Sequence, residues 1–233
     1  PISPLLANIY LNEFDKELES RELHFIRYAD DCIICVKSEM AANRVMNSVT
    51  KWLREHLRVE VNATKTKVAK PKDIKYLGFS FYQKEGKWKP KPHIKSVKKL
   101  EYKLKPLLKR NWGVSMEYRM KKINEVTRGW INYYRIADMK GIMVRIDSKI
   151  RLHIRMCYWK QWKTVKKRAN HLYYLGMPRH WCWLYANTRK GYRRTAEWLG
   201  RWITNELLKQ KGLLSLADHY RKVHAFQQTM LVL

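Results

Sequence analysis

The stretch Leu23-His-Phe-Ile-Arg-Tyr28-Ala-Asp-Asp31-Cys-Ile-Ile-Cys-Val36 decides how the first part of this 233-residue chain folds. Two short runs rich in apolar residues, 23–27 and 32–36, flank a segment with two adjacent carboxylates. Short apolar runs on either side of a turn segment are typical of a β-hairpin. The sequence therefore predicts two strands with Asp30 and Asp31 at the tip between them.

The two carboxylates at this tip suggest a metal site. Like charges at ~4 Å repel by about 4 kcal/mol at an effective dielectric constant of ~20, and a divalent cation removes this cost. Mg²⁺ is commonly bound by one or two carboxylates together with substrate phosphates, as in two-metal nucleotidyl transfer. Taken alone, Asp30 and Asp31 also fit an ordinary solvated β-turn, so both interpretations stay open at this point.

Helical periodicity on both sides of the hairpin predicts an α+β layer. Ser3 and Pro4 read as the N-cap and first residue of one helix. Ser38 begins a second helix, whose apolar residues lie on one face. Further short strands are expected at 59–61, 67–69 and 74–82.

The remainder of the chain is predicted to be helical after the prolines at 71, 90 and 92. Amphipathic patterns predict one helix over 97–108, one that begins after the N-cap Ser115, and one from about 142 to 168. Three helices with short connections indicate a bundle. Residues after Gly176 are expected to form a small separate helical region. The predicted domains are 1–90, 91–170 and 171–233.

The charge of the chain is unusually positive and unevenly distributed. Lys and Arg number 49 against 20 Asp and Glu, a net of +29. Residues 1–63 hold 8 basic and 10 acidic side chains, a net of −2, so residues 64–233 carry a net of +31. With 10 Trp and 14 Tyr besides, this composition favours nucleic acid as the partner rather than a membrane. No apolar run reaches the ~20 residues of a membrane span.

The cysteines and the basic aromatic segment each allow two interpretations. We expect Cys32, Cys35, Cys157 and Cys182 to be free thiols, and the Cys32-x-x-Cys35 pair to belong to a buried strand rather than to a zinc or redox site.

A run of charged residues is usually a solvated face, but the overall excess of positive charge favours RNA binding here. The residues expected on the outer part of the third helix are Arg151, Arg155, Lys160, Lys163, Lys166 and Lys167, mixed with Tyr158, Trp159 and Trp162. Trp130 is expected in the core, while Trp181 and Trp183 are open between core and contact.

Several segments, in order along the chain, resemble reverse transcriptases encoded by group II introns. Tyr28-Ala-Asp-Asp31 resembles their Tyr-x-Asp-Asp box, and Pro1 to Asn12 resembles the segment before it. Tyr76-Leu-Gly-Phe79 is similar to the primer grip, and Lys65-Thr-Lys67 to the segment near the nucleotide phosphates. Arg128-Gly-Trp-Ile-Asn-Tyr-Tyr-Arg135 and Trp159-Lys-Gln-Trp162-Lys163 are similar to the thumb and RNA-binding segments of maturases.

This resemblance implies a partial reverse-transcriptase palm of antiparallel strands and helices, an all-α thumb bundle and a basic C-terminal nucleic-acid-binding region. It implies that Asp30 and Asp31 are catalytic Mg²⁺ ligands, and that the first catalytic aspartate and the fingers lie upstream of Pro1. The residues implied to bind nucleotide or primer are Tyr28, Ala29, Lys65, Tyr76, Leu77, Gly78 and Phe79. Those assigned to RNA are Arg128, Arg135, Arg151, Arg155, Lys160, Trp162, Lys163, Lys166, Lys167, Arg189, Lys190, Tyr192, Arg193 and Arg194.

The function implied is RNA-directed DNA synthesis with a maturase role in splicing. The expected partners are intron RNA, a DNA target or primer, dNTPs and an N-terminal half in the same or another chain. The expected location is the cytoplasm or an organellar interior. Two alternatives remain: a non-catalytic RNA-binding splicing factor with a relic palm, and another family of reverse transcriptase, against which the maturase-like thumb argues.

Overall fold

The computed structural model describes residues 2–230, and side chains up to residue 225. The chain forms two compact units, residues 1–76 and 77–233, and the described part is mostly helical with two small antiparallel sheets. This confirms the α+β class. The packing divides the chain after Tyr76, whereas the division at residues 90 and 170 concerns function and stays a prediction. None of the described helices is long and apolar enough to cross a membrane.

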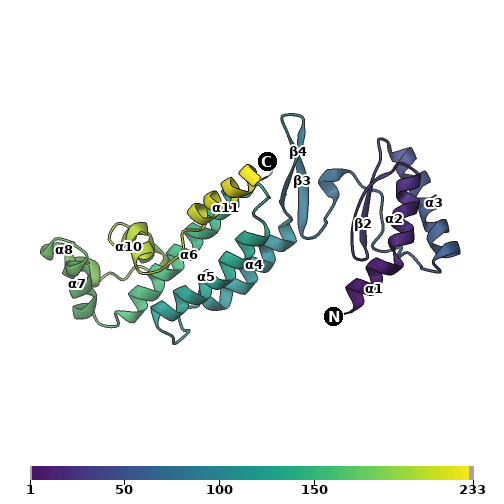
Figure 1. The fold of residues 1–233 in the computed structure, drawn as a ribbon. Coiled ribbons are helices and arrows are strands. Elements are labelled where there is room, and N and C mark those ends of the chain that lie inside the picture. Colours follow the sequence, from purple (N-terminus) through teal and green to yellow (C-terminus); the bar gives the residue numbers. More distant parts are fainter. Residues whose placement is uncertain (1, 231–233) are drawn as a thin grey trace. The chain divides into compact units, whose positions relative to one another are not determined.

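The first unit is a hairpin packed with three helices around a small core (Figure 1). Among the described residues, its buried core consists of Phe14, Leu18, Val49, Leu53 and Leu57. The elements are α1 (Ser3–Tyr10), α2 (Asn12–Ser20), β1 (His24–Tyr28), β2 (Asp31–Cys35), α3 (Glu39–His56) and the 3-10 turn η1 (Pro71–Asp73). The predicted hairpin is confirmed, with each strand within one residue of its expected position.

Helix ends in this unit follow the expected chemistry in one case and not in another. The hydroxyl of Ser38 accepts a hydrogen bond from the Ala41 amide at 3.2 Å, so the predicted N-cap of α3 is confirmed. The prediction that Ser3 caps α1 is wrong, because Ser3 lies inside the helix and Ile2 occupies the cap position without a side-chain cap.

The strands expected at 59–61 and 67–69 are also absent from the described structure. Val59 and Val61 pack against the core of the first unit, but the Val59 amide bonds the Leu53 carbonyl at the end of α3. The apolar pattern at 59–61 therefore reflected packing of an extended segment, not a strand in a ladder. The stretch 74–82 becomes regular only from Phe79 onward.

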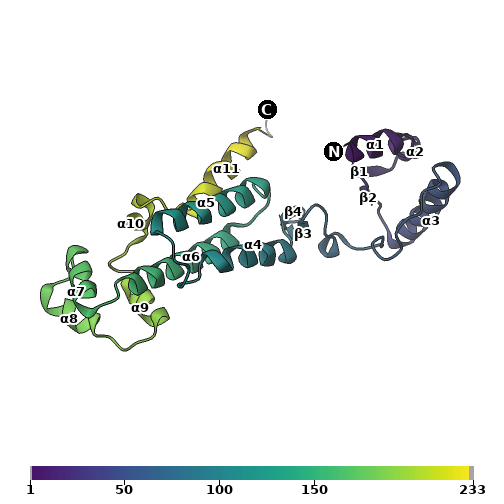
Figure 2. The ribbon, with the colours of Figure 1, turned by 90° about the horizontal axis from the view of Figure 1, so that it is seen from below.

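The second unit begins with a β-hairpin and continues as helices (Figures 1 and 2). The hairpin is β3 (Phe79–Lys84) and β4 (Lys87–Pro92), paired from Phe79↔Pro92 to Lys84↔Lys87. The sequence did not predict β4, because Pro90 and Pro92 argue against a central strand. Proline is tolerated on edge strands, and both strands of a two-stranded ribbon are edges.

The helices of this unit share one core. They are α4 (Ile94–Leu107), α5 (Met116–Tyr133), α6 (Lys140–Gln161), α7 (Val165–Tyr174), α8 (Arg179–Ala186), α9 (Tyr192–Leu199), α10 (Asn205–Gln210) and α11 (Leu216–Met230). The first two predicted helices are confirmed, including the Ser115 cap of α5. The third was predicted too long: it ends at Gln161, and Thr164 caps a new helix, α7. The charged pattern continued across this break because both helices expose lysines.

The C-terminal helices do not form a separate region. α9 packs on α6, and α11 packs on both α5 and α6. Leu199, Leu208 and Leu216 belong to the same buried cluster as Ile123 and Ile150. The expectation that residues after Gly176 form a separate region is therefore wrong as a statement about packing. Sequence distance hid the contact, since the apolar faces of short helices do not reveal their partners.

Candidate catalytic hairpin and nucleic-acid interface

The hairpin of the first unit places both aspartates at its tip. Tyr28 pairs with Asp31, so Ala29 and Asp30 form a two-residue turn. Ala29 has a φ of 53°, in the left-handed region that a non-glycine residue adopts only at a cost. Both carboxylates are exposed, and among the described residues neither forms an ion pair. The turn thus presents two unneutralised carboxylates side by side.

A network centred on Arg27 fixes this strained turn. Its guanidinium forms a bidentate pair with the carboxylate of Asp15 on α2. It also donates to the Ala29 carbonyl at 2.9 Å and to Asn8 Oδ1 at 3.0 Å. The hydrogen bond to Asp15, against an opposing effect of burial, raises the pKa of Arg27. Because Asp15 neutralises Arg27, this arginine positions the turn without compensating the charges of Asp30 and Asp31.

The cysteines after the tip belong to the strand. Cys32 is half-buried, and burial raises the pKa of its thiol to about 11. Cys35 is exposed and pairs with His24 across the ladder. The strand assignment of Cys32-x-x-Cys35 is confirmed, although only part of the strand is buried. A thiol with so high a pKa stays protonated at neutral pH, which suits neither a metal ligand nor a nucleophile.

The donor set at the tip fits Mg²⁺ in one particular way. Within residues 2–230, no group of three or more His, Cys, Asp or Glu side chains is arranged to hold a metal ion. Mg²⁺ is commonly held by one or two carboxylates, with substrate phosphates and water completing the octahedron. Asp30 and Asp31 supply the oxygen ligands of such a site but do not form a complete protein cage.

A second tight turn follows at Leu77 and Gly78. Both residues have positive φ, 47° and 85°. The carbonyl of Gly78 accepts from the His93 amide at 2.9 Å and from the Ser96 hydroxyl at 3.0 Å. A Cβ on Gly78 would lie 2.3 Å from the hydroxyl of Tyr134, so the close approach requires glycine here.

Tyr133, the last residue of α5, and Tyr134, its C-cap, also contact this turn. The Tyr133 hydroxyl donates to the Leu77 carbonyl at 2.9 Å. The ring of Phe79 lies 5.8 Å from that of Tyr133 and 4.9 Å from that of Tyr134. The segment 76–79 and the segment 128–135 were noted separately in the sequence, and the second unit packs Leu77 to Phe79 directly against the tyrosine pair. In the sequence, the glycine at position 78 is the one feature that indicates a close approach at this point.

Most residues assigned to RNA lie on the surface of the second unit. The exposed ones are Arg128, Arg135, Lys160, Lys163, Lys166, Lys167, Arg189, Lys190, Arg193 and Arg194. Tyr192 is half-buried, and the guanidinium of Arg110 lies over its ring at 4.0 Å. Lys65, assigned to nucleotide phosphates, is exposed in a turn of the first unit. Tyr28 is exposed as well, while Ala29 and Tyr76 are half-buried.

Three of these assignments placed side chains on the wrong surface. Arg151 forms a 2.6 Å ion pair with the buried Asp147. Arg155 donates to the Ile203 carbonyl and to Asn205, both at 2.9 Å, and so joins α6 to the segment before α10 and its first residue. Trp162 is buried and stacks on His171. These side chains hold helices together, so the prediction that they line the outer face is wrong.

The buried ion pair on α6 is electrostatically marginal. Burial raises the pKa of Asp147, whereas Arg151 and the backbone of Leu216 lower it. Burial is the largest influence on this pKa, and the ion pair with Arg151 opposes it by favouring the charged carboxylate. The basic residue at 151 is thus part of the fold of the bundle.

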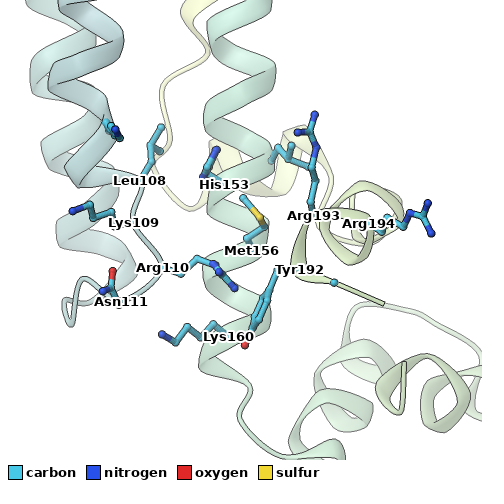
Figure 3. A pocket seen from close by; sticks show the side chains of 13 residues that line it. Leu108, Lys109, Arg110, Asn111, His153, Met156, Lys160, Tyr192, Arg193 and Arg194 are labelled. Atoms are coloured by element: carbon cyan, nitrogen blue, oxygen red, sulfur yellow. The ribbon is translucent and has the colours of Figure 1, made fainter. Parts of the chain in front are cut away.

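A basic cleft lies between α6, α9 and the segment that follows α4 (Figure 3). Its volume is about 1160 Å³. Six cations line it: Lys105, Lys109, Arg110, Lys160, Arg193 and Arg194. Sequence reasoning named Lys160, Arg193 and Arg194 but missed Lys105, Lys109 and Arg110. The sequence shows these three basic residues in the run Lys105-Pro-Leu-Leu-Lys-Arg110. They were overlooked because the helix predicted over 97–108 was interpreted only as a packing element of the bundle.

His153 lies on α6 in this cleft. Burial lowers the pKa of His153, and Lys149, Arg193 and Arg110 lower it further, while a backbone interaction with Leu108 opposes them. The histidine is therefore biased toward its neutral form, first by burial and then by the surrounding positive charges.

Comparison with known proteins agrees with this arrangement. Residues 1–81 match the reverse transcriptase (RNA-dependent DNA polymerase) family. Residues 97–175 match the maturase-specific domain of group II introns. Protein P of duck hepatitis B virus (isolate brown Shanghai duck S5) is 28% identical over 104 residues, which cover 42% of this chain and 13% of that protein. The chain thus aligns with only about an eighth of the length of that curated relative.

The two family matches lie in tandem and cover the aspartate hairpin and the core of the helical bundle, respectively. A segment that matches reverse transcriptases is therefore followed by one that matches the maturase-specific domain of group II introns, and together the two matches support a group II intron reverse transcriptase/maturase.

Proposed function

We propose that this chain forms part of an RNA-directed DNA polymerase of a group II intron that also binds intron RNA as a maturase. The first unit is the end of the palm, and the helices of the second unit are the thumb and a nucleic-acid-binding region. The proposed partners are intron RNA, a DNA target or primer, and dNTPs.

The observation that carries this proposal is the hairpin tip. Asp30 and Asp31 stand exposed without a protein cation among the described residues, on a turn that Arg27 fixes through three partners. Adjacent carboxylates in that state are stabilised by divalent cations. Bound Mg²⁺ would supply activation of the primer hydroxyl and stabilisation of the leaving pyrophosphate. A further carboxylate, from an upstream segment in the same or another chain, is expected to complete the site.

The rigid turn at Leu77 to Phe79 supports a positioning role. Its carbonyl groups accept hydrogen bonds from Tyr133, His93 and Ser96, which restrain the turn. In transfer reactions, holding the reactants in line supplies much of the rate. We propose that this turn positions the primer, and that Lys65 contacts the nucleotide phosphates.

One observation favours a second candidate, a non-catalytic RNA-binding splicing factor. Residues 77–233 hold 36 basic and 9 acidic side chains, a net of +27, against +2 for residues 1–76. Nearly all the excess charge thus belongs to the unit without the aspartate hairpin. Such a unit is suited to neutralise a phosphate backbone whether or not the hairpin is catalytic.

Primer extension separates the two candidates. The chain, joined to the upstream segment that the family resemblance implies, is supplied with an RNA template, a DNA primer, dNTPs and Mg²⁺. The polymerase predicts extension that Asp30→Asn abolishes while RNA affinity stays unchanged. The splicing factor predicts no extension by the wild type and splicing that Asp30→Asn leaves intact.

A further inference from the structure

The basic cleft of the second unit collects positive charge without an internal counter-ion. Among the described residues that line it, none is Asp or Glu. Arg193 has a partner outside the lining, Glu197, but the two are 3.6 Å apart and both are largely exposed. Mutual repulsion among the lining cations destabilises this arrangement in the free protein. An anion in the cleft would relieve it.

Three of the cations act on one region. Arg110 and Arg193 both lower the pKa of His153, which places them near that ring. Arg110 and Lys160 both lower the pKa of the Cys157 thiol, against the larger effect of burial. Figure 3 shows Arg110 reaching toward Tyr192, while Arg194 is directed away from them. Of the six lining cations, Arg110, Lys160 and Arg193 come from the three different segments that meet in the cleft.

The contact between Arg110 and Tyr192 indicates what kind of anion the cleft accepts. With the guanidinium 4.0 Å from the ring centroid, one face of Tyr192 is covered and cannot stack on a base. Stacking leaves the in-plane N–H groups of an arginine free, and it reduces the side-chain entropy lost on binding. A preorganised fork of this type suits the oxygens of a phosphate.

The size of the cleft gives room for more than one phosphate group. A volume of about 1160 Å³ far exceeds the space of one phosphate group, and the cations come from three separate segments of the chain. A polymer with regularly spaced phosphates matches both features.

We propose that the cleft binds consecutive phosphates of an RNA backbone, with Arg110, Lys160 and Arg193 as the charged contacts. This deepens the proposed function and rests on it only in taking the polyanion to be RNA. The cleft favours the backbone over the bases, because its lining supplies cations and Arg110 already occupies one face of Tyr192.

The test compares two triple variants of the full chain in binding to a labelled RNA duplex without Mg²⁺ or dNTPs. Arg110→Gln/Lys160→Gln/Arg193→Gln removes three charges from the cleft. Lys98→Gln/Lys99→Gln/Lys103→Gln removes the same number from exposed positions of α4. The cleft variant should flatten the log–log salt slope by about three units, at roughly 0.9 per phosphate contact. Its affinity should fall by roughly 100-fold, as expected when several charge-assisted hydrogen bonds are lost. Equal effects of the two variants would overturn the proposal.

Two further measurements address folding and ligand class. Lys160→Gln/Arg193→Gln retains the contact between Arg110 and Tyr192, and should still flatten the slope by about two units. In the wild type, RNA should raise the pKa of His153, followed by NMR of its ring protons, because a bound anion offsets the surrounding cations. The groups that set this pKa besides the cleft cations are Lys149, which Glu101 partly neutralises at 3.5 Å, and the backbone of Leu108.

An unchanged His153 pKa on RNA binding would place the RNA elsewhere and overturn the site. Poly-glutamate that competes as well as RNA at equal charge would show that the cleft takes acidic polypeptides, and would overturn the ligand class. None of these outcomes depends on polymerisation. If Asp30→Asn retained polymerisation, the proposed catalytic role would be wrong, but the proposal for the cleft would still be decided by the RNA-binding measurements alone.

Discussion

The two units of this chain differ in charge and in the size of their cores. The first is nearly neutral, with a net charge of +2, and packs its hairpin against a core of five buried residues among those described. The second carries +27 and, within the part that the structure describes, builds one cluster of 29 buried residues from helices and the segments between them. A core of that size can bear a strongly repulsive surface, which a small core could not.

The two units are therefore suited to different tasks: the first to exact positioning of a few atoms, and the second to binding through many charges. The hairpin presents two carboxylates on a turn fixed by a single arginine network, so its chemistry depends on a few atoms. The bundle distributes its cations over many exposed positions, so its binding is expected to depend on their number. Substitutions in the two units should therefore differ in which property they change and by how much.

The largest effect is expected for Asp30→Asn. Losing a metal ligand removes several kcal/mol of transition-state stabilisation, so cDNA synthesis by the polymerase that contains this chain should fall by at least about 1000-fold. RNA affinity, measured by filter binding, should not change, because binding belongs to the other unit. Asp73→Asn, which removes an exposed carboxylate of the same unit, is the matched control and should retain activity. Polymerisation at a tenth of the wild-type rate would contradict the assignment of Asp30.

Next comes Arg151→Gln, which asks whether a basic residue of the bundle is structural. Removing one partner of a buried ion pair leaves an uncompensated charge and should cost about 3–4 kcal/mol in the free energy of unfolding, measured by chemical denaturation at pH 7. Lys149→Gln is the control. Its exposed pair with Glu101 should contribute less than about 1 kcal/mol.

The pH dependence of the same variant has a defined sign. Burial raises the pKa of Asp147, and removing Arg151, which lowers it, should raise it further. Between the unfolded pKa of about 3.9 and the folded value, the folded protein binds more protons than the unfolded chain. Stability should therefore fall as pH rises through this window, and more steeply in Arg151→Gln than in the wild type. A loss that is independent of pH would show that the arginine acts through packing alone.

Gly78→Ala tests the contact between the turn and the tyrosine pair. A left-handed alanine costs about 1 kcal/mol, and the clash of its Cβ with Tyr134 at 2.3 Å should add about 2 kcal/mol. Gly86→Ala separates the two effects, since Gly86 also has positive φ, 74°, but a Cβ there meets nothing within 4 Å. We expect a loss of about 3 kcal/mol in unfolding free energy for the first and about 1 kcal/mol for the second.

Tyr134→Phe should recover much of the difference, because it deletes the oxygen that the new Cβ would meet. Equal destabilisation by Gly78→Ala and Gly86→Ala would mean that the turn can move away from α5. In that case the loop would not be the rigid element that primer positioning requires.

The smallest effect is expected at the hairpin of the second unit. The hydrogen bond to Asp138 raises the pKa of Tyr82 to about 12. In Asp138→Asn this pKa should return to about 10, followed by NMR of ¹³C-labelled tyrosine. Glu85→Gln, which removes a smaller influence on the same hydroxyl, should leave it near about 12. A Tyr82 pKa that is insensitive to Asp138 would show that the hairpin is not tied through this bond to the segment between α5 and α6.

Local patterns determined much of the fold. Residues 23–36 alone predicted the hairpin and its tip, because a turn segment between two short apolar runs has few other solutions. Ser38 and Ser115 were predicted and found as N-caps, since capping depends on residues three positions apart. Charge counting located the strongly basic part of the chain, because net charge depends on composition alone. Asp30 and Asp31 were identified as candidate metal ligands because they are adjacent in the sequence and because the segment around them resembles the Tyr-x-Asp-Asp box.

Only the tertiary structure decided which side of each helix faces a neighbour. Arg151, Arg155 and Trp162 read as surface residues in the sequence, yet packing with Asp147, the segment before α10, and His171 buries or holds them. The contact of Leu77 and Gly78 with Tyr133 and Tyr134, and the cleft that Arg110, Lys160 and Arg193 line together, join segments about 30 to 80 residues apart. Such contacts follow from the summed burial of several short helices, and no local pattern contains that sum.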